Sequence, residues 1–119
     1  MRKLAFIALT LCCNPASAEE LSAGRIQNEL VGQTIIWWES SGWLTGHLVL
    51  LPDGRAKLAV ESPRPANDVG QWTIRGNEIC TAWNSMRAGN SKCYSIQETE
   101  TGHFITSGGN EFEVPGAGV

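Results

Sequence analysis

Few residues in this chain are of the kinds that carry catalysis or bind nucleic acid. Its 119 residues include two histidines, His47 and His103, and nine lysines and arginines against twelve aspartates and glutamates. Nucleic-acid binding needs clustered basic side chains that neutralise phosphates, so we expect no nucleic-acid partner. The glycine pair at 108–109 has no lysine beside it and no helix after it, so it does not match a phosphate-binding loop.

Other catalytic arrangements are also missing from the sequence. No serine lies in a nucleophile elbow, and no apolar run reaches the roughly 20 residues that a membrane-spanning helix needs. His47 and His103 lie in separate predicted strands, which leaves open a two-histidine site completed by a carboxylate. Single distant histidines are usually surface or packing residues. We therefore predict no metal, no cofactor and no catalytic residue.

The first 18 residues have the pattern of a secretory signal peptide. A basic start at residues 1–3 precedes an apolar run at 4–13, and the small residues at 16–18 predict cleavage after Ala18. A lipid anchor at Cys12 or Cys13 is the alternative, but neither cysteine follows a small residue. We expect a periplasmic or secreted protein with one β-rich domain at 19–119. Without Arg2 and Lys3, seven basic and twelve acidic residues give it a net charge of −5, which argues against anionic membrane surfaces.

Two cysteines remain after residue 18, Cys80 and Cys93. In an oxidising compartment a single pair in a small domain most simply forms a disulfide. A metal site is the alternative, but no nearby histidine or third cysteine completes a tetrahedral ligand set. With Cys80 opposite Cys93, an antiparallel register places Ile79 opposite Tyr94 on the core face and both cysteines on the other face.

The order of hydrophobic residues predicts one helix followed by an antiparallel sheet. Residues 21–30 form the helix, with Ser22 as its cap and Gly32 after its end. From residue 33 onward apolar residues recur with period two, broken by turn sequences at 52–54 and 76–77. The proline-rich stretch 62–68 is predicted as a loop. About seven or eight short strands, 92–97 among them, indicate an all-β meander curled into a lipocalin-like small barrel or half-barrel. The tail at 115–119 is predicted to be disordered.

The chain has five tryptophans, many for its length, and they are the residues that say most about a binding surface. Trp72 and Trp83 are predicted to fill the core. Strand alternation cannot bury Trp37, Trp38 and Trp43 on one side, so we expect one or two of them to line a pocket or lie on the surface. With His47 they form the candidate ligand or partner surface. The alternative is that a helix or a neighbouring sheet covers this face.

A wider pattern resembles a known family. It starts with Leu21-Ser22-Ala23 and 30–32, continues with Pro52-Asp53-Gly54, and has its most specific part in Gly70-x-Trp72-x-Ile74-x-Gly76-Asn77-x-Ile79-Cys80, Trp83 and Cys93-Tyr94. The pattern is similar to a family of small exported proteins of Gram-negative bacteria classed as a domain of unknown function. The resemblance implies export, a small β-rich fold and the disulfide, and it implies no activity.

These observations favour a monomeric, non-catalytic binding protein of the cell envelope. In one version it holds a small apolar ligand in the barrel mouth, in a cavity lined by Trp37 or Trp38. In another version it binds an envelope protein, for instance as an inhibitor, through the loop that contains Pro63 and Pro65. A small enzyme built on His47 or His103 is the second alternative, and it requires one of them to lie beside a carboxylate inside a cleft.

Overall fold

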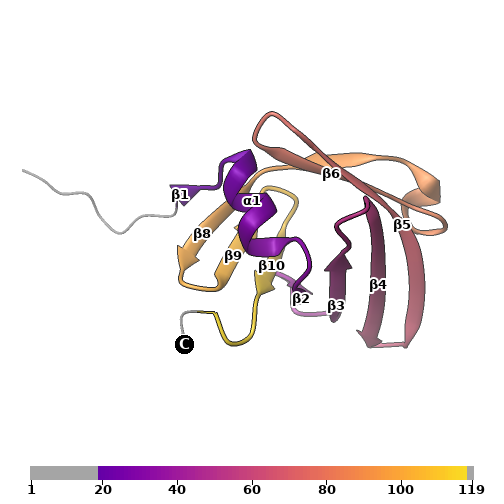
Figure 1. The fold of residues 1–119 in the computed structure, drawn as a ribbon. Helices are drawn as coiled ribbons and strands as arrows, with labels where there is room; N and C mark the ends of the chain where they lie inside the picture. The colour runs from indigo at the N-terminus through magenta and orange to yellow at the C-terminus, as the bar shows by residue number, and fades with distance from the viewer. Residues whose placement is uncertain (1–18, 118–119) are drawn as a thin grey trace, which may run out of the picture.

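The structure is a computed structural model that describes residues 19–117, and it is dominated by β-strands (Figure 1). The predicted signal peptide and the alternative anchor cysteines lie outside the described residues. The strands are β1 (Glu19–Glu20), β2 (Thr34–Glu39), β3 (Thr45–Leu50), β4 (Arg55–Ser62), β5 (Ala66–Arg75), β6 (Glu78–Trp83), β7 (Lys92–Tyr94), β8 (Ile96–Glu100), β9 (His103–Thr106) and β10 (Asn110–Glu113). The described residues also form one α-helix, α1 (Ala23–Leu30), and one 3₁₀ turn, η1 (Met86–Gly89).

All ten strands belong to one antiparallel sheet, in the order β1-β8-β9-β10-β2-β3-β4-β5-β6-β7. Strand β7 lies at one edge of this order and β8 lies next to the other edge, yet only Ser95 separates them in the chain. The sheet therefore curls until its two ends are close together. The Ser95 N–H donates to Ser107 Oγ and the Ser107 N–H donates to Ser95 O, both at 3.0 Å. The predicted all-β half-barrel with one short helix is therefore confirmed. It has more strands than predicted, partly because Ser95 divides the expected strand 92–97 in two.

One apolar core fills the interior of the curled sheet. The strands alternate between buried and more exposed residues, most regularly in β3 and β4. The buried strand residues include Ile35, Trp37, Leu48, Leu50, Leu58, Trp72, Ile79, Trp83, Ile96, Phe104 and Phe112. The core positions predicted for Trp72 and Trp83 are confirmed.

Helix α1 covers one end of the half-barrel. The Ser22 hydroxyl accepts a hydrogen bond from the Arg25 N–H at 3.3 Å, as an N-cap does, and Ile26 and Leu30 are fully buried. The helix is fastened at both ends to this end of the sheet. The Ala23 N–H donates to Asn77 Oδ1 in the β5–β6 turn at 3.0 Å, and the N–H of Gly32, just after the helix, donates to Leu50 O at 2.8 Å.

A group of ion pairs holds α1 against two strands. The Arg25 guanidinium lies 2.6 Å from carboxylate oxygens of both Glu29 and Glu98, and 3.2 Å from one of Glu19. Hydrogen bonds to Glu29 and then Glu98 raise the pKa of Arg25 further above its ordinary value, so this residue stays charged. Glu98 belongs to β8 and Glu19 to β1, so one side chain joins the helix to two strands of the sheet.

Two segments differ from the sequence prediction. Residues 66–68 were predicted as part of the proline-rich loop, but they begin β5 and pair with β4, Ala66 opposite Val60 and Asp68 opposite Leu58. That prediction was wrong at 66–68 and also at residue 62, which ends β4 and pairs with Thr45, because the two prolines restrict only the turn at 63–65. The tail was predicted to be disordered, whereas residues 115–117 form a turn in which the Ala117 N–H donates to Val114 O.

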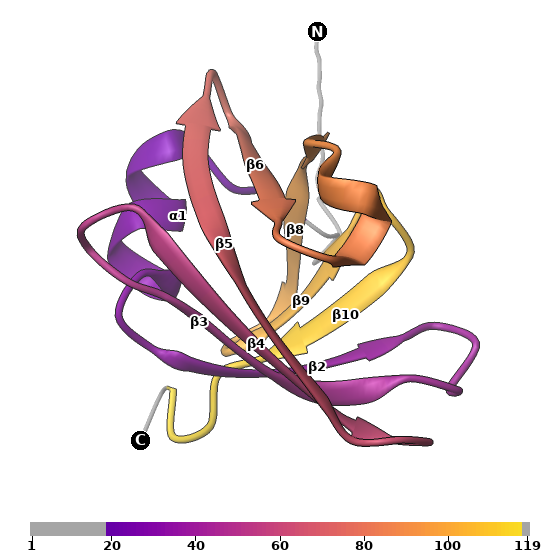
Figure 2. The same ribbon diagram turned by 90° about the vertical axis from the view of Figure 1, so that its right-hand side faces the viewer.

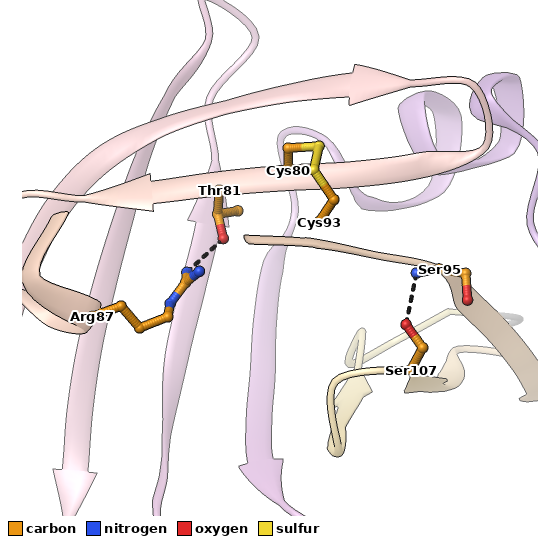
Figure 3. Close-up of a disulfide and its surroundings, with 6 residues drawn as sticks. All are labelled: Cys80, Thr81, Arg87, Cys93, Ser95 and Ser107. Carbon is orange, nitrogen blue, oxygen red and sulfur yellow. Dashed lines mark hydrogen bonds between the residues drawn. A yellow bond between two sulfur atoms is a disulfide. The ribbon is translucent and has the colours of Figure 1, made fainter. Parts of the chain in front are cut away.

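The disulfide between Cys80 and Cys93 joins paired positions of β6 and β7 (Figure 3). Ile79 pairs with Tyr94, as the sequence predicted. Ile79 is buried and Tyr94 packs against the core. Because β7 has only three residues, the covalent link fastens a short edge strand to the sheet.

We expect the double substitution Cys80→Ala/Cys93→Ala to lower the free energy of unfolding by about 3 kcal/mol, since it removes a cross-link that restricts the unfolded chain. Urea denaturation of the oxidised protein and of the variant measures this difference. Reductant should destabilise the native protein to a similar extent and leave the variant unchanged. Equal stabilities of the oxidised native protein and the variant would contradict a structural role for the disulfide.

Gly46 and Gly24 offer a matched pair of glycine substitutions. A Cβ on Gly46 would overlap the carbonyl group of Ala59 on β4, whereas a Cβ on Gly24 in α1 meets nothing within 4 Å. We expect Gly46→Ala to cost about 1–3 kcal/mol of stability and Gly24→Ala to add about 0.5–1 kcal/mol. Thermal unfolding followed by circular dichroism checks the two signs, and a stabilising Gly46→Ala would contradict the close approach of β3 and β4.

Candidate functional site

The candidate site is a pocket inside the half-barrel, at the end away from α1. Its volume is about 300 Å³. Figure 2 shows α1 and the η1 turn on opposite sides of the curled sheet. The inner walls of this mouth pocket are apolar and largely aromatic, formed by Trp37, Leu48, Leu58, Trp83, Tyr94 and Phe112. These residues come from six strands, β2, β3, β4, β6, β7 and β10.

Polar side chains line the same pocket. They are Glu39, Thr81, Arg87, Lys92, Thr106 and Asn110. Thr81 is almost fully buried, whereas Arg87 and Lys92 are exposed. The pocket therefore combines apolar walls with a charged, solvent-exposed edge.

Arg87 is held in a fixed position at this edge. Its Nη2 donates to Thr81 Oγ1 at 2.8 Å (Figure 3). Arg87 and Ala88 both adopt left-handed backbone conformations, with φ of 55° and 52°. Such conformations cost free energy in residues other than glycine and persist where the surroundings impose them.

The Asp68 carboxylate is one of the groups that hold η1 in this conformation. Its Oδ2 accepts hydrogen bonds from the N–H groups of Met86 at 2.9 Å and Ser85 at 3.1 Å, and its Oδ1 accepts one from the Val69 N–H. Burial acts to raise the pKa of Asp68, but the backbone hydrogen bonds outweigh it and hold the pKa below the ordinary value. Asp68 thus fastens the start of η1 to β5.

A second turn at the edge of the pocket is built in a similar way. Thr106 Oγ1 accepts hydrogen bonds from the N–H groups of Gly108 at 3.2 Å and Asn110 at 3.1 Å, which fixes the β9–β10 turn. The Lys92 side chain extends from β7 toward this turn, since a Cβ on Gly108 would lie 3.4 Å from Lys92 Nζ. Arg87 thus reaches the pocket edge from η1, within the segment between β6 and β7, and Lys92 reaches it from the first residue of β7.

Tyr94 forms part of the inner wall of the mouth pocket. Desolvation raises the pKa of its hydroxyl, an effect partly offset by a hydrogen bond with Thr81 and by the charge of Arg87. The tyrosine hydroxyl therefore stays neutral across the physiological range.

Of the four residues predicted as the ligand or partner surface, only Trp37 lines the mouth pocket. It is 4% exposed, and its Nε1 has no hydrogen-bond partner among the described residues. Trp38 lies outside this pocket, where its ring centroid is 5.5 Å from that of His103. Trp43, at the tip of the β2–β3 hairpin, is 74% exposed.

The two histidines also lie outside the pocket. His47 Nδ1 is 2.7 Å from Glu61 Oε2, and both side chains are partly exposed. His103 Nδ1 lies 3.9 Å from Glu100 Oε1. Among residues 19–117 no group of three or more His, Cys, Asp or Glu side chains is placed to hold a metal ion.

Sequence reasoning missed Thr81, Arg87 and Lys92. One signal was present for Lys92. If Cys93 points away from the core, its neighbours Lys92 and Tyr94 must point toward the interior, where an unpaired lysine is unusual. Arg87 gave no such signal, because its direction depends on an irregular turn and not on strand alternation.

Comparisons of the chain with protein-family models, curated proteins and solved structures found no match. The resemblance to a family of small exported proteins therefore stays a prediction. In the described part of the chain, no helix is both long and apolar enough to cross a membrane.

We expect Asp68→Asn to lower the free energy of unfolding by about 1–2 kcal/mol at pH 7, because hydrogen bonds to a charged acceptor are lost. The folded-state pKa of Asp68 lies below its ordinary value of 3.8. Its contribution is therefore present above pH 3.8 and lost as the pH falls through the folded-state pKa. Urea denaturation at several pH values should show the two proteins converging in acid.

Two features make this comparison specific. Backbone and side-chain hydrogen bonds from Arg55 also lower the pKa of Asp53, but Asp53 is present in both proteins and its effect cancels. Glu113→Gln, which changes an exposed carboxylate on β10, serves as the charge control. A stability difference between Asp68→Asn and the native protein that stays constant down to low pH would contradict the role assigned to the Asp68 carboxylate.

Proposed function

We propose that this protein is an exported binding protein of the cell envelope that holds a small apolar ligand in the mouth pocket. The observation that carries the proposal is the apolar cavity of about 300 Å³ inside a half-barrel whose other end is covered by α1. Ligand sites in proteins typically enclose about 300–1,000 Å³ and have apolar walls with few polar groups. This cavity lies at the small end of that range and suits a compact ligand.

Export is supported by two features. The predicted signal peptide at residues 1–18 and the Cys80–Cys93 disulfide both fit an oxidising compartment outside the cytoplasm. We infer a periplasmic or secreted protein.

A protein partner is the second candidate function. Thr45 pairs with Ser62, so the β2–β3 tip that carries Trp43 lies beside the β4–β5 turn that contains Pro63 and Pro65. Exposed tryptophans are frequent at the centres of protein interfaces. The ligand-binding proposal takes precedence because Trp43 is a single exposed ring, whereas six apolar and aromatic side chains from different strands line the pocket. An enzyme built on His47 or His103 draws no support from the geometry, since neither residue lines the pocket.

The neutral fluorescent probe N-phenyl-1-naphthylamine tests the first candidate. We expect its fluorescence to rise on binding to one saturable site with a Kd on the order of 100 µM or tighter. Leu58→Phe should weaken this binding at least tenfold by filling the pocket. Ile105→Phe, which enlarges an exposed residue of β9, is the matched control and should bind like the native protein.

The result depends on folded proteins, so urea denaturation of each variant accompanies the titration. A probe that binds equally to native protein and a folded Leu58→Phe variant would place its site elsewhere and contradict the proposal. No saturable binding, together with capture of an envelope protein that is lost in Trp43→Ser, would favour the second candidate.

A further inference from the structure

We propose that the ligand of the mouth pocket is a small anionic amphiphile, with an apolar body against the inner walls and a carboxylate head held by Arg87 and Lys92. This inference rests on the proposed function and deepens it. The charged residues that line the pocket are Arg87, Lys92 and Glu39. They give the pocket a net charge of +1, within a chain whose residues from 19 onward carry −5.

The two cations are available to a ligand. Among the described residues neither Arg87 nor Lys92 lies within ion-pair distance of a carboxylate, whereas Arg25 and Arg55 both do. Arg87 makes one side-chain hydrogen bond, to the neutral hydroxyl of Thr81. A guanidinium has five N–H donors, so most of its donors remain for an anionic partner.

The position of Arg87 is built in advance of binding. The Thr81 hydrogen bond and the Asp68 contacts at Ser85 and Met86 hold η1 at the pocket edge, with Arg87 and Ala88 in left-handed conformations. A side chain fixed before binding loses less conformational entropy when the ligand arrives. The strained backbone at Arg87 and Ala88 is accounted for by this role, since strain of this kind concentrates at ligand-binding sites.

The separation of apolar and charged groups indicates an amphiphile. The inner walls contribute Trp37, Leu48, Leu58, Trp83 and Phe112, and the cations lie on exposed residues of η1 and β7. An anion without an apolar body would leave the walls unfilled. A neutral apolar molecule would fill the walls but gain nothing from the two cations, which would stay hydrated.

Octanoate and 1-octanol, which have the same number of carbon atoms, test the charge requirement as competitors of N-phenyl-1-naphthylamine. At pH 8 and low salt we expect octanoate to displace the probe at about tenfold lower concentration than 1-octanol, as a charge-assisted hydrogen bond would give. Simple partitioning into an apolar pocket predicts the reverse order, because the alcohol is the more apolar of the two. Added salt should weaken octanoate and leave 1-octanol unchanged.

Three variants and one control test which residues cause the preference for octanoate over 1-octanol. Arg87→Gln and Lys92→Gln should each reduce the preference for octanoate over 1-octanol about three- to tenfold, measured as the ratio of the two competitor concentrations within each folded variant. Glu39→Gln removes a carboxylate from the pocket and should strengthen octanoate binding roughly two- to fivefold, a gain that a damaged fold would not produce. Arg75→Gln removes a cation from the β5–β6 hairpin at the other end of the sheet and should change nothing.

The outcomes separate the two proposals. Probe binding with 1-octanol as the equal or better competitor overturns the anionic ligand and leaves the pocket as a site for neutral apolar molecules. An octanoate preference that survives in folded Arg87→Gln and Lys92→Gln variants also overturns it. Absence of saturable probe binding, with no protection by octanoate against thermal unfolding, overturns both proposals.

Discussion

Burial of one apolar face of a continuous sheet is the constraint on which the rest of the structure depends. A sheet with a single apolar face must curl on itself or be covered. Here ten strands curl, and α1 covers one end with Ile26 and Leu30 fully buried. In the described part of the chain, the other end of the half-barrel is formed by turns, including η1 and the β9–β10 turn. The mouth pocket is the part of the interior that these turns leave unfilled.

The edge of the pocket follows from the need to satisfy buried polar groups. Thr81 faces the interior between Ile79 and Trp83, where an unpaired hydroxyl would be costly. Arg87 supplies one partner beside Tyr94, and its contact with Thr81 also brings a guanidinium to the pocket. Asp68 holds the turn in which Arg87 lies. One set of hydrogen bonds thus serves both the fold and the binding site.

Much of the fold could be predicted because its signals are local. Ser22 caps the helix, the turn sequences separate the strands, and the two cysteines fix the pairing of Ile79 with Tyr94. The strand break at Ser95 could not be predicted, because it depends on a hydrogen bond to Ser107, twelve residues away. The site was predicted less well than the fold. Trp37 was named, whereas Arg87 was missed because its direction depends on a left-handed backbone that non-glycine residues seldom adopt.

The indole N–H signals of the tryptophans report directly on where a ligand binds. Trp37 and Trp83 line the mouth pocket, Trp72 donates its indole N–H to Leu51 O at 2.8 Å, and Trp38 packs beside His103 outside the pocket. Titration of ¹⁵N-labelled protein with N-phenyl-1-naphthylamine, followed by NMR, should shift the Trp37 and Trp83 signals and leave those of Trp72 and Trp38 in place. Shifts confined to Trp38 and the exposed Trp43, with Trp37 and Trp83 unchanged, would contradict a binding site inside the half-barrel.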